Sequence, residues 1–371
     1  MKIVLFYHSL LSDWNHGNAH FLRGVATELI ARGNDVAIYE PENSWSLSNL
    51  VKEHGEDAIA EFRNYYPTLK SIQYNSATIN LDRVLENADL VIVHEWNEHA
   101  LVKKIGEKRK KLPFKLLFHD THHRAVTETA SMKSYDLSSY DGVLAFGAVI
   151  RNIYLKEEWT KKAWTWHEAA DTRIFKPLSS DHYDGDLVWV GNWGDEERTK
   201  ELFEFIINPV KELKLKAKIY GVRYPEHARK ALTDAGIEYG GWLPNFKAPE
   251  VFARYRFTAH VPRGPYVQSL PGIPTIRPFE ALACGIPLLS SPWDDAENLF
   301  TPGKDFVFAK NKEEMKTWIL KLLSNESWVS EMTEHGLQTI QQKHTCIHRV
   351  DELYAICEEL GVKNITNQIP V

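Results

Sequence analysis

Residues 271–295 read PGIPTIRPFEALACGIPLLSSPWDD. Pro278 suits the first position of a helix, because its missing N–H would have no intrahelical partner there, and Gly285 suits the left-handed position that closes a helix. The stretch therefore predicts a helix of about two turns. A buried strand is expected directly after it, over the apolar segment IPLLSS.

Two charged residues, Arg277 and Glu280, fall near the amino end of this helix. The unpaired N–H groups and the helix dipole favour anions at that end. Glu280 alone could be explained as a carboxylate that complements the dipole. Arg277 is unfavourable there unless it serves a ligand, so the pair indicates an anionic ligand such as a phosphate.

Strand and helix patterns alternate on both sides of this stretch. KIVLFYH is a buried-strand pattern, NAHFLRGVATELIARG is a helical one, and DVAIYE is again a strand. The alternation lapses over residues 169–185 and restarts at DLVWVG. Such alternation produces a parallel sheet covered on both faces. We therefore expect an α/β protein with two Rossmann-like, doubly wound domains, residues 1–168 and 175–349, facing each other across a cleft.

Composition restricts the classes of function. Of 371 residues, 25% are charged, and the net charge of −6 argues against a nucleic-acid partner. The three cysteines, Cys284, Cys346 and Cys357, have no disulfide or zinc spacing, which fits a reducing compartment. The first apolar run is too short for a signal sequence or a membrane span, so we expect a cytoplasmic protein without a transmembrane segment. The 12 Trp and 15 Tyr favour aromatic-lined sugar sites, although aromatic packing is the alternative.

A second phosphate-type pattern is VWVGNWGDEERTKEL. A strand is expected to end at Val190, and the turn containing Gly191 and Gly194 lets a ligand approach the backbone. Asp195 is a good N-cap, which would place Arg198 in the first turn of the next helix. The pattern is neither GxGxxG nor a P-loop.

The segment HVPRGPYVQSLPGIPT, residues 260–275, is expected to be a long irregular connection. Long loops of this kind tend to carry function. Arg263, Tyr266 and Gln268 are candidates for contacts to a nucleotide base or a diphosphate.

Two histidine-rich segments lie in the N-terminal half. FHDTHHRAV follows a predicted strand, so His119 and Asp120 would project at its carboxyl end and are candidate catalytic residues. His122 and His123 are interpreted as loop or helix-start residues. No HExxH occurs and few carboxylates stand at ligand spacing, so no metal site is expected.

The other histidine-rich segment, HSLLSDWNHGNAHF, follows the first strand. Gly17 would allow close backbone approach, and Asn18 would cap the following helix. His16 or Asp13 is a candidate base. The alternative is a capped helix entry with polar loop residues.

The segment RPFEALACGIPLLSSPWDDAENLFTPGKDFV resembles the donor-binding signature of GT-B glycosyltransferases. ADTRIFKP is similar to the interdomain linker of that family, and VGNWGDEERTKEL resembles its phosphate loop. The branch that the chain resembles most is the spore-maturation glycosyltransferase-like group, related to the large retaining family that includes glycogen and sucrose synthases. The resemblance covers residues 188–309 best.

The resemblance implies roles for particular residues. Glu280 would accept hydrogen bonds from the ribose of a nucleotide-sugar, Arg277 and Arg198 would face its diphosphate, and His119 would contact the donor sugar. The other donor-side candidates are Gly191, Asn192, Phe279, Arg263, Tyr266 and Gly17. The retaining family usually has a second glutamate eight positions before Glu280, and here that position is Gly272.

The function expected from these residues is transfer of a sugar, as by a hexosyltransferase, from a nucleoside-diphosphate-sugar to an acceptor. The resemblance implies a retaining, metal-independent reaction with no cofactor beyond the nucleotide-sugar co-substrate. It also implies that the C-terminal helix, about residues 350–371, packs back on the first domain. The acceptor is left open between a glycan, a lipid-linked glycan, a small molecule and a protein. The alternatives are a nucleotide-sugar epimerase and a non-catalytic nucleotide-sugar-binding protein.

Overall fold

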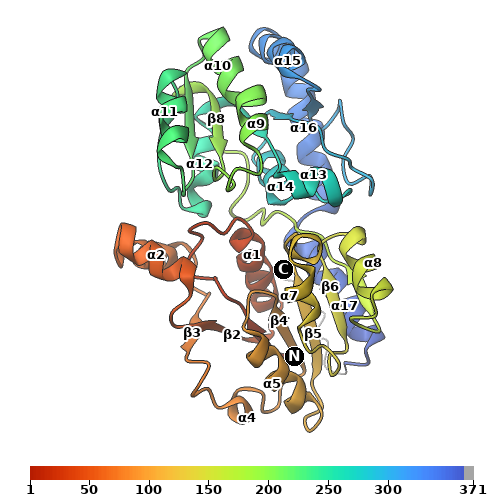
Figure 1. The fold of residues 1–371 in the computed structure, drawn as a ribbon. Helices are drawn as coiled ribbons and strands as arrows, with labels where there is room; N and C mark the ends of the chain where they lie inside the picture. Colours follow the sequence, from red (N-terminus) through yellow and green to blue (C-terminus); the bar gives the residue numbers. More distant parts are fainter. Residues whose placement is uncertain (363–371) are drawn as a thin grey trace. The chain divides into compact units, whose positions relative to one another are not determined.

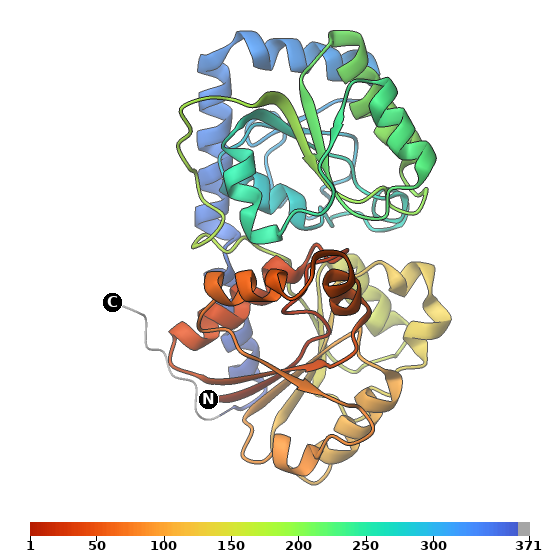
Figure 2. The same cartoon turned by 90° about the vertical axis from the view of Figure 1, so that its left-hand side faces the viewer.

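The structure, a computed structural model, describes residues 1–362, which form two compact units. Unit 1 consists of residues 1–168 and 346–362, and unit 2 of residues 169–345. Each unit contains a sheet with helices on both of its faces (Figures 1 and 2). All described strand pairs in the two sheets are parallel. These features confirm the predicted α/β class with two doubly wound sheets.

The sheet of unit 1 has the strand order β3-β2-β1-β4-β5-β6-β7. Its central strands carry runs of buried apolar residues, as is typical of parallel strands covered on both faces, and all of LVIVH in β4 is buried. The strands are β1 (Lys2–Phe6), β2 (Asp35–Pro41), β3 (Ser71–Tyr74), β4 (Leu90–His94), β5 (Lys115–Asp120), β6 (Gly142–Ala145) and β7 (Ala163–Thr165). The helices are α1 (Ala19–Ala31), α2 (Trp45–His54), α3 (Asp57–Tyr65), α4 (Leu81–Val84), α5 (His99–Arg109), α6 (Arg124–Thr127), α7 (Thr129–Lys133), α8 (Ala148–Lys156) and α17 (Cys346–Glu359).

Helix α17 joins unit 1 although it follows unit 2 in the sequence. Arg32, which follows α1, pairs with Asp351 at 2.6 Å, and the Asn34 amide donates to the Tyr354 hydroxyl at 2.7 Å. The indole N–H of Trp166 donates to the carbonyl oxygen of Arg349. The helix begins at Cys346, earlier than expected, and residues 363–371 of the expected C-terminal helix lie outside the described residues.

The sheet of unit 2 has the strand order β10-β9-β8-β11-β12-β13. Its strands are β8 (Gly185–Val190), β9 (Ala217–Tyr220), β10 (Glu238–Tyr239), β11 (Tyr255–His260), β12 (Leu288–Ser290) and β13 (Val307–Phe308). Its helical segments are α9 (Thr199–Leu202), the π-helical turn η1 (Phe203–Ile207), α10 (Asn208–Leu213), α11 (Glu226–Asp234), the 3-10 turn η2 (Asn245–Lys247), α12 (Ala248–Phe252), α13 (Gly264–Ser269), α14 (Ile276–Ala283), α15 (Lys312–Ser324) and α16 (Glu326–Lys343). Trp189 and Trp193 are buried in its core, so the aromatic-packing alternative accounts for these two tryptophans.

The signature helix α14 differs from its prediction at one end. It closes as expected, with Gly285 in the left-handed region at φ +66° after Cys284. It begins at Ile276 rather than at Pro278, after Thr275 at φ +60°. Pro278 still lies in the first turn, where its missing N–H breaks no intrahelical hydrogen bond.

Two loop predictions of unit 2 are wrong. Asp195 is not an N-cap, because it adopts φ +51° within the turn, and α9 begins only after Arg198. Residues 260–275 are not wholly irregular, because they contain the short helix α13. Pro265 occupies its first turn, where proline is tolerated.

Across residues 1–362, none of the helices combines the length and the apolar composition that a bilayer crossing requires.

Two glycines of unit 1 make a matched test of its packing. A Cβ at Gly142 in β6 would lie 2.4 Å from the Trp164 ring and 2.9 Å from the Lys162 carbonyl oxygen, whereas a Cβ at Gly106 in α5 meets only contacts of 3.4 Å or more. We expect Gly142→Ala to lower the free energy of unfolding by about 1–3 kcal/mol through overpacking. Gly106→Ala should raise it by about 0.5–1 kcal/mol, because alanine favours the helix. Urea denaturation measures both, and equal effects would contradict the packing described for β6.

Candidate functional site

Polar residues gather in unit 1 where three neighbouring strands end. His8 lies just beyond β1, His94 ends β4 and is followed by Glu95, and His119 and Asp120 end β5. Because parallel strands place their carboxyl ends at one edge of the sheet, these residues come together there. His119 and Asp120 lie at the strand end where the sequence placed them, and both are buried.

Four imidazole rings, of His8, His16, His94 and His119, form what we call the imidazole cluster. The ring centroids of His8 and His16 are 4.2 Å apart, those of His8 and His94 5.4 Å, and those of His94 and His119 5.3 Å. Burial lowers the pKa of His8 and of His119 to about 3. Burial and the neighbouring rings hold the pKa values of His16 and His94 well below the ordinary value. The four rings are therefore neutral at neutral pH.

Neutral imidazole offers one hydrogen-bond donor and one acceptor. Within the described part of the chain, no hydrogen-bond partner reaches the buried nitrogens His8 Nδ1, His16 Nε2 and His119 Nε2. Buried polar atoms are normally hydrogen-bonded, so such atoms point to a ligand or water. His94, by contrast, is bonded through Nε2 to the Thr121 hydroxyl at 3.0 Å.

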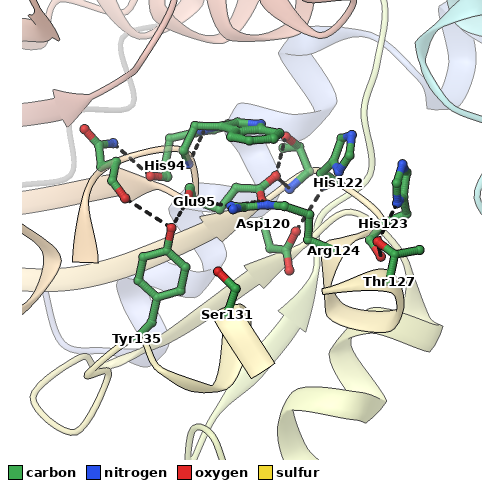
Figure 3. Close-up of polar contacts among 12 residues, drawn as sticks. His94, Glu95, Asp120, His122, His123, Arg124, Thr127, Ser131 and Tyr135 are labelled. Carbon is green, nitrogen blue, oxygen red and sulfur yellow. Dashed lines mark hydrogen bonds and ion pairs between the residues drawn. The ribbon is translucent and has the colours of Figure 1, made fainter. Parts of the chain in front are cut away.

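A buried ion pair fixes the loop that follows β5 (Figure 3). The guanidinium of Arg124 donates to Oε2 of Glu95 from Nη2 at 2.7 Å and from Nε at 3.1 Å. The other oxygen of Glu95 accepts from the backbone N–H of Thr121 at 3.1 Å, and the Tyr135 hydroxyl donates to the Glu95 carbonyl oxygen. Sequence reasoning missed this network; the only signal was the position of Glu95 at the end of an apolar strand.

Asp120 is a carboxyl group with two internal partners. It accepts hydrogen bonds from the Tyr154 hydroxyl at 2.9 Å and from the backbone N–H of His122 at 3.1 Å. Burial, with the neighbouring charge of Glu95, holds its pKa well above the ordinary value.

The loop after β1 departs from its prediction at Asp13 and Asn18. Asp13 is paired with Arg23 at 2.8 Å, and both side chains are buried, so the structure assigns it to an internal ion pair rather than to a base. The Asn18 side chain donates to the Thr121 hydroxyl and does not cap α1. Gly17 is exposed and is not among the residues in the left-handed region.

In unit 2, Arg198 lies at the edge of the sheet where the strands β8 and β11 end. Its guanidinium donates to the carbonyl oxygens of Asn192 at 2.5 Å and Val261 at 2.7 Å, after β8 and β11 respectively, and lies 5.0 Å from the centroid of the Trp189 ring. No carboxylate of residues 1–362 forms an ion pair with it, and its buried Nε has no hydrogen-bond partner there. Burial lowers its pKa to about 10, and the charges of Arg263 and Arg277 add to this effect.

A second guanidinium, that of Arg263, lies beside the first. A Cβ at Gly194 would lie 2.9 Å from Nε of Arg198 and 3.4 Å from Nε of Arg263, and Gly194 has φ +89°. Only glycine fits beneath the two side chains. Arg263 differs from Arg198 in having carboxylate partners, Asp195 at 3.0 Å and Glu197 at 2.7 Å.

Three other candidates of unit 2 have structural contacts. The side-chain oxygen of Asn192 accepts from the backbone N–H of Val222 at 2.8 Å. Gly191 packs under Trp189, because a Cβ there would lie 2.8 Å from the indole. Tyr266 is buried in α13.

The signature pair of α14 is more enclosed than predicted. Glu280 is fully buried, is ion-paired with Arg277, and accepts a hydrogen bond from the Asn245 amide at 3.0 Å. The expectation that Glu280 is presented at an open helix end is wrong, because it is the fifth residue of α14. Phe279 is also buried, with the centroid of its ring 5.4 Å from that of Phe300.

The surroundings of position 272 account for the absence there of the glutamate that the retaining family usually has. Gly272 has φ +86°, and a Cβ there would lie 2.7 Å from Cγ of Glu297 and 2.8 Å from its Oε1. The Glu297 side chain thus occupies the space that a side chain at 272 would need.

Sequence reasoning also missed His260, at the carboxyl end of the central strand β11. Its Nδ1 is bonded to the Ser290 hydroxyl at 3.0 Å, and burial, with the charges of Arg198 and Arg277, lowers its pKa to about 3. Its place at the end of the strand FTAHVP was the available signal. Among the described residues, no group of three or more His, Cys, Asp or Glu side chains is arranged to hold a metal ion.

Residues 198–355 match the model of a family described as glycosyl transferase-like. The comparison with curated proteins found no match to this chain. Among solved structures, the chain is similar to a glycosyltransferase from Rickettsia africae, with 13% identity, a TM-score of 0.69 and coverage of 98% of this chain and 99% of that one. It is also similar to a sucrose-phosphate synthase from Thermosynechococcus elongatus, with 12% identity, a TM-score of 0.63 and coverage of 97% and 99%. A third is HepE of Anabaena in complex with UDP and glucose, with 11% identity, a TM-score of 0.66 and coverage of 96% and 99%.

Because the imidazole cluster is neutral in the folded protein, we expect the free energy of unfolding to depend on pH. Replacement of His119 tests this expectation. In the unfolded chain its pKa is near 6.5, and in the folded protein it is about 3. As the pH falls below 6.5, the unfolded state binds a proton that the folded state does not bind. His119 therefore contributes a loss of stability of about 1.4 kcal/mol per pH unit on falling from about 6 toward 3.

His119→Phe should remove this contribution. Above about pH 7, the free energies of unfolding of His119→Phe and of the wild type should differ by a constant amount. As the pH falls below about 7, the free energy of unfolding of the wild type should decrease more than that of the variant. Urea denaturation at pH 8, 7, 6 and 5 measures it, and a difference that does not vary with pH would contradict the assignment.

Proposed function

We propose that this chain, which has the GT-B fold of glycosyltransferases, transfers a sugar from a nucleoside diphosphate donor that binds at Arg198 in unit 2. The observation that carries the proposal is the partly buried guanidinium of Arg198, whose buried Nε has no hydrogen-bond partner and which forms no ion pair with a carboxylate of the described residues. A partly buried charge without an ion-pair partner costs free energy, because it loses part of its hydration. An anionic ligand at this position would offset that cost.

A diphosphate suits the site better than a single carboxylate does. Arg198 and Arg263 lie side by side over Gly194, and Arg277 is close enough for its charge to lower the pKa of Arg198. Guanidinium groups form strong charge-assisted hydrogen bonds with phosphate oxygens. His260 lies among the same charges and adds a neutral imidazole.

The same charges suit the chemistry of sugar transfer. When the bond to the sugar breaks, negative charge develops on the departing diphosphate. The Arg198 guanidinium, already fixed by the carbonyl oxygens of Asn192 and Val261, would stabilise that charge without reorganisation, and Arg263 and Arg277 would add to the positive potential. We propose that they act without a bound metal ion and that the nucleotide-sugar is the sole co-substrate.

The base of the donor is proposed to be uracil. Solved structures of similar fold contain UDP, including HepE of Anabaena and an α-glucosyltransferase. We propose that Glu280 binds the ribose of the donor. Its carboxylate now contacts Asn245 and Arg277. It would exchange one of these partners for a ribose hydroxyl group. A hexosyl group and retention of configuration are proposed on the resemblance of the signature segment.

Replacement of Arg198 tests the donor site. Arg198→Gln should weaken UDP binding by about 10- to 150-fold, as expected for the loss of hydrogen bonds from a charged group, and should leave uridine binding nearly unchanged. Arg198→Lys keeps the positive charge and should therefore lose less affinity for UDP than Arg198→Gln does. Isothermal titration calorimetry measures the affinities.

The matched control is Arg254→Gln, because Arg254 is an exposed arginine of unit 2 that pairs with Asp184. It should bind UDP as the wild type does. Thermal unfolding of every variant shows whether the loop of Arg198 remains folded. Wild-type UDP affinity in a folded Arg198→Gln protein would contradict the proposed site.

A further inference from the structure

Trp96 is a tryptophan that is both exposed and fixed. It follows β4 at the carboxyl edge of the sheet in unit 1, and 40% of its surface is exposed. The Arg124 guanidinium lies 4.1 Å from the centroid of its ring. Arg124 is in turn held by the buried carboxylate of Glu95 (Figure 3). A buried ion pair therefore fixes one face of an exposed indole, which reduces the entropy cost of binding a ligand there.

Two imidazole rings lie close to this indole. The centroid of the His122 ring is 5.2 Å from that of Trp96, with the rings at 68°, and the centroid of the His8 ring is 5.8 Å away. His8 contacts His16 in turn. The buried atoms His8 Nδ1 and His16 Nε2 have no hydrogen-bond partner in residues 1–362, and the side chain of His16 is about nine-tenths buried.

In the described residues, both arginines of this part of unit 1 are paired with carboxylates. Arg124 is paired with Glu95, and Arg23 with Asp13. Burial keeps the imidazoles of His8 and His16 neutral. The contrast with unit 2, where Arg198 lacks a carboxylate partner, indicates that the two units recognise ligands of different charge.

We propose that Trp96, His8 and His16 form the binding site for a neutral pyranose ring of the acceptor, so that the acceptor is a carbohydrate. One side of a pyranose is lined by C–H bonds, which pack on the electron-rich face of an indole. Its hydroxyl groups both donate and accept hydrogen bonds, as neutral imidazole nitrogens do. A nucleic acid or a phosphorylated acceptor would instead need unpaired cations. The assignment of this sugar as the acceptor rests on the proposed function.

Binding of sugars to the full chain tests the proposal without a donor. The probes are methyl glycosides of glucose, galactose, mannose and N-acetylglucosamine, at up to about 20 mM. Glycerol 3-phosphate and a short single-stranded oligonucleotide are the anionic comparators. Saturation-transfer difference NMR reports contact with the protein, and samples are measured with and without saturating UDP.

The variants are Trp96→Ala, Trp96→Phe and a matched control, Trp45→Ala. Trp45 is another exposed tryptophan of unit 1, with 56% of its surface exposed, and it packs on Trp14 instead of on the imidazole rings. We expect at least one glycoside to bind saturably, Trp96→Ala to weaken it at least about tenfold, and Trp96→Phe to weaken it less. Trp45→Ala should bind as the wild type does. Trp96→Met replaces Trp96→Ala if the alanine variant does not fold.

Three results would overturn the proposal. They are the absence of saturable glycoside binding in every sample, equal binding by the wild type and the folded Trp96 variants, and Trp96-dependent binding of an anionic comparator only. Calorimetry with UDP on the same samples separates this proposal from the proposed function. Normal UDP binding without sugar binding would reject only the carbohydrate site, and loss of UDP binding in the wild type would reject the donor site.

Discussion

The guanidinium of Arg198 is partly buried and is held by two main-chain oxygens rather than by a carboxylate. Partial burial of a charge without an ion-pair partner costs free energy that an anionic ligand would offset. The parallel sheet makes this arrangement possible, because β8 and β11 are neighbours and the segments after them place the carbonyls of Asn192 and Val261 beside each other. Gly194 then leaves room for Arg198 and Arg263.

The two units use the same architecture with different electrostatics. In each, the polar residues lie where parallel strands end, as is usual for ligand sites in open α/β sheets. Unit 2 gathers arginines at that edge, and unit 1 gathers neutral imidazoles and a fixed indole. A charged nucleotide and an uncharged sugar are the two classes of ligand that these edges match.

Local patterns predicted the elements, and pairings distant in the sequence escaped prediction. Hydrophobic periodicity located the strands other than β3 and most helices, and Gly285 correctly marked the end of α14, because these features depend on neighbouring residues. The burial of Glu280 depends on Asn245, 35 positions away, and the fixing of Trp96 depends on Arg124 and Glu95, 29 positions apart.

The errors within loops have a similar origin. Asp195 has the composition of an N-cap, yet its carboxylate pairs with Arg223 and Arg263 from other segments, and its backbone turns to φ +51°. In the sequence, Asp13 lies in a polar loop that suggests a base, but in the structure its carboxylate is paired with Arg23. Sequence shows which residue types are present, and the fold decides which charges neutralise one another.

The most direct test of the account is the NMR signal of the Arg198 Nε–H group, assigned by its absence from Arg198→Gln. This N–H has no hydrogen-bond partner among the described residues, and a diphosphate would provide one. The account predicts that the signal shifts saturably with UDP and does not shift with uridine. A protein that binds UDP while this signal stays unchanged would contradict it.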